Sequence, residues 1–214
     1  MKRYPVPAQE IRRELVVVNS RFIATLAPAF TVEQAKAFIA RIRSEFPDAS
    51  HNVAAFLVGF GDSVIAHCND NGEPAGTAGR PSLAVLKGSG LGDVAVVVTR
   101  YFGGTKLGTG GLVRAYGDAV RLVVKDVIRA EKVLTHTIML VVPYNLFERV
   151  RMLVAAHHGQ ILNEDFGAGV TIAAQFEIEH FPTFQTALQT LSNGVLQANI
   201  IETNETLLPL NPSV

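Results

Sequence analysis

Apolar and polar residues alternate along this chain with two different spacings, and each spacing predicts a different kind of element. An early stretch places apolar residues three and four positions apart, as on one face of a helix. They are Val32, Ala35, Phe38, Ile39 and Ile42. Thr31 and Gln34 have the spacing of a capping box just before this stretch. We therefore expect a helix from Thr31 to about Phe46.

Runs of β-branched and apolar residues around this helix predict strands. The first two, 16–18 and 21–27, meet at a turn, and the next two, 53–60 and 63–67, form a hairpin. The uninterrupted apolar run 94–99 is typical of a strand that is buried on both faces. A short helix from Pro81 to Gly88 and a long helix from Thr109 to about Ala130 complete this part of the chain.

The pattern changes at Thr135. From there it predicts a strand at 138–142, a helix at 143–157, a hairpin at 161–165 and 170–178, a helix at 182–191 and a strand at 195–202. This βαββαβ order is the split-βαβ or ferredoxin-like plan. We predict an α+β protein with two domains, a βα domain over 1–132 and a ferredoxin-like domain over 135–205.

Charge is distributed unevenly between these two parts. The whole chain has no formal net charge, so it exerts no long-range attraction on nucleic acid. Residues 1–134 nevertheless carry 17 Lys and Arg against 12 Asp and Glu, whereas residues 135–214 carry 2 against 7. The asymmetry predicts two domains with different surfaces, and the acidic C-terminal domain is a candidate site for a protein partner.

Few features of the chain bear on its location. Cys68 is the single cysteine, so an intrachain disulfide is excluded. No secretory signal pattern and no apolar run of about 18 residues is present, and we therefore expect a cytoplasmic protein without a membrane contact.

Two glycine-rich tracts stand out, at 69–81 and 100–112. Eleven of the 18 glycines lie between Gly72 and Gly111. The second tract joins a buried strand to a helix N-terminus, where free amides and the helix dipole favour anions. Neither a nucleotide P-loop nor a dinucleotide fingerprint is present, because Thr109-Gly110 follows Gly108 and Val113 stands where the last glycine belongs.

Candidate binding residues lie in these tracts and on the helix that follows. We expect a ligand or nucleic acid to contact Asp70, Glu73, Thr77, Arg80, Arg100, Tyr101, Lys106, Thr109, Gly110, Arg114, Arg121 and Lys125. Loops 69–80 and 103–111 should meet in one cleft, with Arg80, Arg100, Lys106 and Arg114 around its rim.

Each of these signals has a second interpretation. Asp70 and Glu73 have the chemistry of an acid pair, but carboxylates at such positions also cap turns. Arg114, Arg121, Lys125 and Lys132 share one helical stripe that suits RNA phosphates, and a solvated helix face has the same pattern. The six histidines show no metal-ligand spacing, so we predict neither a metal nor a cofactor.

Three segments in order resemble the IMPACT/YigZ family over nearly the full length: Asp70 with 72–79, Arg100 to Gly104, and Leu107 to Tyr116. The resemblance implies a first domain similar to a domain of a small-subunit ribosomal protein and to domain IV of elongation factor G, and a second similar to its domain V. It also implies that eukaryotic members regulate translation initiation by binding proteins, and it brings no established enzymatic activity. Asn71 stands where many members have an acidic residue.

These observations favour a non-enzymatic module that binds RNA or the ribosome and modulates translation. An enzyme acting on a phosphorylated small molecule is the alternative, with Asp70 or Glu73 as the base and Lys106 and Arg100 holding the phosphate. A regulator that acts purely by protein–protein binding is the third interpretation.

Overall fold

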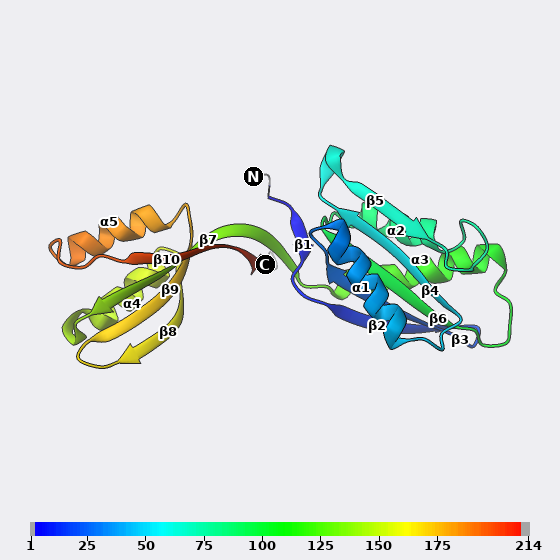
Figure 1. The fold of residues 1–214 in the computed structure, drawn as a ribbon, viewed down its shortest axis with the longest axis horizontal. Coiled ribbons are helices and arrows are strands. Elements are labelled where there is room, and N and C mark those ends of the chain that lie inside the picture. Colours follow the sequence, from blue (N-terminus) through cyan, green and yellow to red (C-terminus); the bar gives the residue numbers. More distant parts are fainter. Residues whose placement is uncertain (1–2, 211–214) are drawn as a thin grey trace. The chain divides into compact units, whose positions relative to one another are not determined.

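The computed structural model describes residues 3–210 and divides them into two units (Figure 1). The first unit comprises residues 3–131 and 208–210, and the second comprises Lys132–Leu207. Both contain helices packed on an antiparallel sheet, so the protein is α+β. The second unit is inserted into the chain of the first, because residues 208–210 return to the first unit.

A five-stranded antiparallel sheet forms the centre of the first unit. Its strands follow the order β2 (Ile11–Val17), β3 (Ser20–Pro28), β6 (Val94–Tyr101), β4 (His51–Val58) and β5 (Ile65–Asn69). The predicted hairpins are confirmed: β2 turns directly into β3, and a single 3-10 turn, η1 (Gly61–Ser63), separates β4 from β5. β6 lies at the centre and is buried along its whole length except Tyr101, which is half-buried, as its uninterrupted apolar run predicts.

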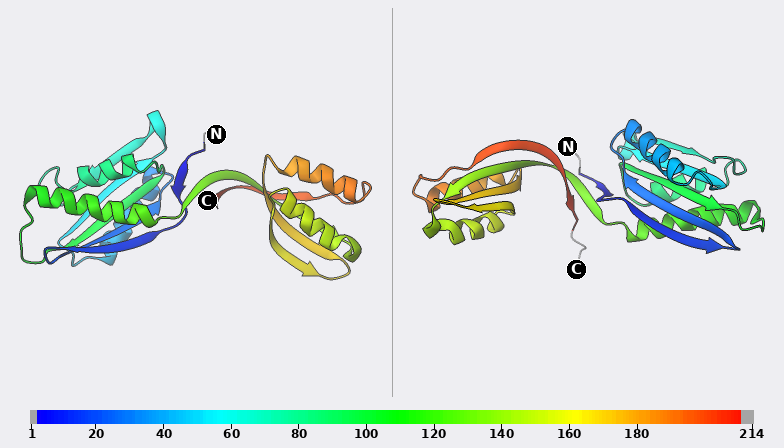
Figure 2. Two further views of the ribbon diagram at one scale, coloured as in Figure 1. Left: turned by 180° about the vertical axis from the view of Figure 1, so that it is seen from behind. Right: turned by 60° about the horizontal axis from the view of Figure 1, so that its bottom comes forward.

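Helices cover both faces of this sheet. α1 (Val32–Glu45) lies on one face, and α2 (Gly79–Gly88) and α3 (Gly108–Asp126) lie on the other (Figures 1 and 2). Alternate residues of the same strands serve the two cores: Val96 of β6 packs toward α2 and α3, whereas Val97 packs toward α1. The period-two alternation of a strand accounts for this division.

The predicted cap of α1 is confirmed, because the Thr31 hydroxyl accepts from the Gln34 amide at 3.1 Å; the Gln34 side chain in turn accepts from the Phe30 amide at 2.8 Å, one residue before the N-cap. Two other predicted helix boundaries need correction. α2 begins at Gly79, which makes Pro81 its third residue rather than its first. α3 ends at Asp126, four residues before the expected end, because the chain enters β7 (Arg129–Val142) at Arg129.

The early end of α3 also removes one member from the predicted basic stripe. Lys132 lies in β7, where its ammonium is 3.0 Å from Glu205. It is therefore part of a strand and engaged by a carboxylate, and only the other three cations of the stripe remain on the helix.

The second unit has the predicted βαββαβ order. Its elements after β7 are α4 (Tyr144–Ala156), β8 (Gln160–Phe166), β9 (Val170–Glu177), α5 (Phe181–Leu191) and β10 (Asn199–Pro209). The strands follow the order β8-β9-β7-β10 in the sheet. The connection from β7 to β8 through α4 therefore passes over β9, and the connection from β9 to β10 through α5 passes over β7. β10 begins four residues later than expected and reaches Pro209, so that the Leu210 amide bonds to the Arg129 carbonyl at 2.8 Å.

Gly103 allows the second glycine loop to lie against the β2–β3 turn. A Cβ at Gly103 would stand 2.0 Å from the carbonyl oxygen of Asn19 and 2.5 Å from the amide nitrogen of Ser20. Because both of these are backbone atoms, no side-chain rotation can relieve the overlap. The glycine at this position is required by the close approach of two chain segments.

We predict that Gly103→Ala destabilises the first unit by about 1–3 kcal/mol, the usual effect of overpacking. Gly88→Ala is the matched control, since a Cβ there would meet nothing within 4 Å. Hydrogen exchange of the β6 amides measures the free energy of opening in both variants. Equal effects of the two substitutions would contradict the prediction.

Candidate functional site

The first glycine loop is organised by Asp70. Its carboxylate accepts hydrogen bonds from the amides of Gly76 at 2.8 Å, Ala78 at 3.1 Å and Gly79 at 2.8 Å. Burial raises the pKa of Asp70, but these bonds and the charge of Arg80 outweigh it and lower the pKa below its ordinary value. Asp70 therefore fixes the loop and the start of α2, and its carboxylate is engaged by backbone amides and not available to a ligand.

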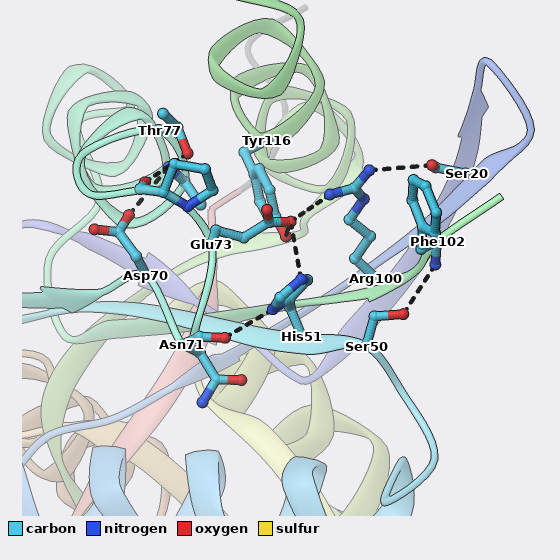
Figure 3. A network of polar contacts seen from close by, with 12 residues as sticks. Ser20, Ser50, His51, Asp70, Asn71, Glu73, Thr77, Arg100, Phe102 and Tyr116 are labelled. Atoms are coloured by element: carbon cyan, nitrogen blue, oxygen red, sulfur yellow. Dashed lines mark hydrogen bonds and ion pairs between the residues drawn. The ribbon is translucent and has the colours of Figure 1, made fainter. Parts of the chain in front are cut away.

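Glu73 of the same loop forms a buried ion pair with Arg100 at the end of β6. Arg100 Nη1 lies 2.6 Å from Glu73 Oε1, and the two side chains are only 5% and 3% exposed. The Tyr116 hydroxyl of α3 donates to the same Oε1 at 2.7 Å (Figure 3). Burial, followed by this hydrogen bond, raises the pKa of Tyr116 well above its ordinary value, so the hydroxyl remains a donor.

Arg100 has hydrogen-bond partners at both terminal nitrogens, whereas its Nε is buried and has none among the residues that the structure describes. Its Nη2 donates to Ser20 Oγ at 3.2 Å, and Ser20 Oγ also accepts from the Gly103 amide at 3.2 Å. The guanidinium carbon lies 5.3 Å from the ring centre of Phe22 and 5.5 Å from that of Phe102. Arg100 does line the hollow between the two glycine loops, as expected, but it is buried and paired with Glu73 and is therefore not an accessible cation.

The two glycine loops do meet in one hollow, as predicted. We call it the Glu73 pocket; its volume is about 440 Å³. The first loop contributes Gly72, Glu73 and Pro74, and the second contributes Lys106, Gly108 and Thr109. Lys106 and Thr109 are exposed, and the N-terminus of α3 opens here. The pocket thus combines helix amides and one accessible ammonium, which is a combination that favours an anion.

His51 is a pocket residue that the sequence analysis did not select. Its Nδ1 lies 2.9 Å from the Asn71 carbonyl oxygen, and its Nε2 lies 3.8 Å from Glu73 Oε1 (Figure 3). Tyr116 was also missed, although a tyrosine on the apolar face of a helix usually needs a partner for its hydroxyl. No local signal in the sequence marks Ser20 as a partner of Arg100.

A second opening, the α2–α3 groove, lies between the two helices that cover one face of the sheet. Its volume is about 900 Å³. Four cationic side chains line it, and none of the described Asp or Glu residues does: the cations are Arg80, Arg121, Lys125 and Arg129. Val85, Val113 and Val124 form apolar parts of its wall. Arg121 also pairs with Asp118 one turn earlier on α3, and both side chains are 60% exposed.

The predicted site residues are divided between these two places and a third, structural group. Glu73, Arg100, Lys106 and Thr109 line the Glu73 pocket, and Arg80, Arg121 and Lys125 line the α2–α3 groove. Arg80 and Arg114 do not lie on the pocket rim as expected, since Arg80 faces the groove and Arg114 contacts the Gly110 carbonyl on its own helix.

Thr77 and Tyr101 have structural partners. The Thr77 hydroxyl donates to the Pro74 carbonyl at 2.7 Å, and the Tyr101 hydroxyl donates to Asp48 at 2.9 Å. Gly110 is different, because a Cβ there would meet nothing within 4 Å. The space in front of the first turn of α3 is therefore open.

Glu73 and His51 are the acid–base groups that line the pocket. Arg100 and Tyr116 both engage the Glu73 carboxylate, and His51 lies beside it. Asp70 points its oxygens at loop amides instead. Within residues 3–210, no group of three or more His, Cys, Asp or Glu is arranged to hold a metal ion, and no helix is long and apolar enough to cross a bilayer.

We predict that Glu73→Gln destabilises the first unit by about 3–5 kcal/mol, because it leaves the Arg100 charge buried without a counterion. Glu14→Gln is the control in the same unit, since Glu14 is 42% exposed and pairs with Arg21 on the surface; its effect should be near zero. Adding Arg100→Met to Glu73→Gln should recover part of the loss. Hydrogen exchange of the β6 amides measures all three, and a neutral Glu73→Gln would contradict the assignment.

We predict that protonation of Asp70 lowers the free energy of unfolding of the first unit at acidic pH. Because the folded pKa of Asp70 is lowered, its stabilising contribution is complete above the ordinary value of about 3.9 and is lost as the pH falls through the folded value. Asp70→Asn should therefore cost about 1–2 kcal/mol at neutral pH, and the difference from the unchanged protein should shrink in acid. Urea unfolding across this pH range tests this; a difference that is constant with pH would contradict it.

Known proteins similar to this chain cover both units. The sequence profile of the Impact N-terminal domain matches residues 18–124, and a domain of unknown function, DUF1949, matches residues 140–195. The chain is 38% identical to the IMPACT family member YigZ of Escherichia coli over 203 residues, which is 94% of this chain and all of that protein.

One solved structure and one eukaryotic protein extend the comparison. The crystal structure of a hypothetical protein matches with a TM-score of 0.62 and 38% identity over 94% of this chain and 98% of that chain. The Protein IMPACT of Bos taurus is 34% identical over 94 residues, which is 42% of this chain and 29% of that protein.

Proposed function

This chain belongs to the IMPACT family, and on that premise we propose that it is a non-enzymatic module that binds RNA or the ribosome and modulates translation. The α2–α3 groove is the observation that carries the proposal. The link to translation comes from the family resemblance and not from the groove itself.

The charge of the groove supports an RNA ligand. Its four cations lie on three elements, α2, α3 and the first residue of β7, so they are distributed along an opening and not gathered at one point. A distributed row of cations suits the repeated charges of a phosphate backbone. The apolar wall around Val113 and Val124 offers contacts to sugars or bases beside those charges.

The Glu73 pocket continues this surface on the other side of the first glycine loop. Residues 72–74 line the pocket, and Gly76 and Arg80 line the groove. α3 contributes to both, through Thr109 and Leu112 on one side and Val113 and Gly117 on the other. We propose a further phosphate at the start of α3, where Lys106, Thr109 and Gly110 are exposed and a helix N-terminus favours an anion.

The acidic charge of the second unit also fits the proposal. Its excess of Asp and Glu over Lys and Arg repels RNA and would restrict binding to the first unit. The acidic unit is also the candidate site for a basic protein partner.

We predict that Arg121→Glu combined with Lys125→Glu weakens binding of a single-stranded oligouridine RNA at least tenfold at low salt. The slope of log affinity against log salt should fall by about one for each phosphate that the variant no longer neutralises. Lys36→Glu with Arg149→Glu reverses the same number of charges at exposed positions outside the groove and should change neither quantity. Fluorescence anisotropy across a salt series measures both.

Two results would refute the RNA proposal. One is the absence of binding to oligouridine and to purified ribosomes at low salt. The other is an equal reduction of affinity in the groove variant and in its charge-matched control. A rise in melting temperature with one phosphorylated metabolite and not with RNA would instead favour the enzyme alternative.

A further inference from the structure

A third opening lies on the opposite face of the first unit, between α1 and β5, and we call it the α1–β5 groove. Its volume is about 510 Å³. Ile39, Phe56 and Ile65 give it an apolar floor and edge. Its charged or polar lining residues are Lys36, Arg43, His67 and Asn69. Among the residues that the structure describes, no Asp or Glu lines it.

β5 is the last strand of the sheet on this side. The strand order ends at β5, whose pairing with β4 uses one edge of its backbone. The N–H and C=O groups of alternate residues along its other edge point away from β4, as in any edge strand. Ile65, Ala66 and His67 are exposed along this edge, whereas Gly79 of α2 lies against the backbone of Asn69. The part of the edge available to an added strand is therefore Ile65 to His67.

The two edges of the sheet are protected differently. β2, at the other end of the strand order, carries Arg12, Arg13 and Glu14 in succession. Charged residues of this kind discourage another chain from pairing with an edge. β5 reads Ile-Ala-His-Cys-Asn, without Lys, Arg, Asp, Glu or Pro, and its register with β4 is regular from Ile65 to Asn69. This edge therefore lacks the protection that the opposite edge has.

The strand register joins this edge to the groove. His67 lies opposite Phe56 and Ile65 lies opposite Val58, and residues directly opposite one another share a face. Phe56 and Val58 pack toward α1, so His67 and Ile65 also stand on the α1 side. Ile65 is 53% exposed there. The open backbone edge and the apolar groove thus form one continuous surface.

The charges around the groove specify the sign of its occupant. Lys36 and Arg43 stand seven residues apart on α1 and line the same groove, and Lys36 is exposed. The Nε atom of Arg43 is buried, and it has no hydrogen-bond partner among the residues that the structure describes. Carboxylates on an occupant would complement both cations.

We propose that the α1–β5 groove binds an extended acidic segment of a partner protein, which adds to the sheet as a strand beside β5. Main-chain hydrogen bonds to β5 hold the segment, an apolar side chain enters between Ile39 and Phe56, and carboxylates reach Lys36 and Arg43. This site lies on the face of the sheet opposite the α2–α3 groove, so it is independent of the proposed RNA surface.

A designed peptide tests the proposal on the full chain. The acetylated and amidated peptide Thr-Glu-Thr-Val-Thr-Glu-Thr presents two carboxylates and one apolar side chain on a single face when extended. NMR titration should shift the backbone amides of residues 65–67 and of α1, and hydrogen exchange of the outward-facing β5 amides should slow. The same peptide with Lys in place of Glu should not bind.

Two matched changes separate strand addition from simple charge attraction. Lys36→Glu, at an exposed position, should weaken binding of the acidic peptide at least tenfold, whereas Arg121→Glu on the other face should leave it unchanged. Methylating the peptide nitrogens on the edge that faces β5 removes its donors without altering the protein, and it should abolish binding.

Several outcomes would overturn the proposal. They are no amide shifts at millimolar peptide, shifts confined to the second unit or to the α2–α3 groove, full binding by the methylated or the Lys peptide, and unchanged binding to Lys36→Glu. Displacement of the peptide from β5 by oligouridine would also overturn it, because the groove would then be part of the RNA surface.

Discussion

The buried ion pair between Glu73 and Arg100 is the constraint on which the functional end of the first unit depends. It joins the first glycine loop to the end of the central strand β6, while Tyr116 ties the same carboxylate to α3 and Ser20 ties the guanidinium to the start of β3. Two charges removed from water depend on their mutual contact and on the hydrogen bonds around them. Four segments supply these contacts here, and Arg100 Nε is the one nitrogen of the guanidinium without a partner among the described residues.

This arrangement explains why the glycines gather where they do. Segments that must meet around one ion pair approach one another closely, and a Cβ at Gly79 would stand 2.7 Å from the Asn69 carbonyl oxygen, much as one at Gly103 would overlap the β2–β3 turn. Asp70 then fixes the loop that carries Glu73 by collecting three amides. In the second loop and the first turn of α3, by contrast, a Cβ at Gly104, Gly108 or Gly110 would meet nothing within 4 Å.

Periodicity predicted the elements well, because burial of one face imposes a spacing that any sequence must show. It gave the order of the elements in both units and the two-sided burial of β6. It failed where a tertiary contact sets a boundary. The end of α3 depends on the pairing of residues 129–131 with β1 (Pro5–Pro7), and no residue pattern near Lys132 predicts that strand. The role of Arg100 was misjudged for a similar reason, since its counterion lies 27 positions away on another loop. A charge in a glycine-rich tract has the same sequence signature whether it is buried or free.

The return of the chain at Leu208 has a consequence for dissecting the protein. The backbone leaves the first unit near Arg129 and re-enters it where Leu210 bonds to that same residue, so the two crossing points are neighbours. A truncation after residue 131 would remove the segment that bonds to Arg129, and the measured stability of the remaining first unit would then be too low. Excising residues 132–207 and bridging the gap with a short flexible linker would keep both ends and give an isolated first unit that folds as it does in the intact chain.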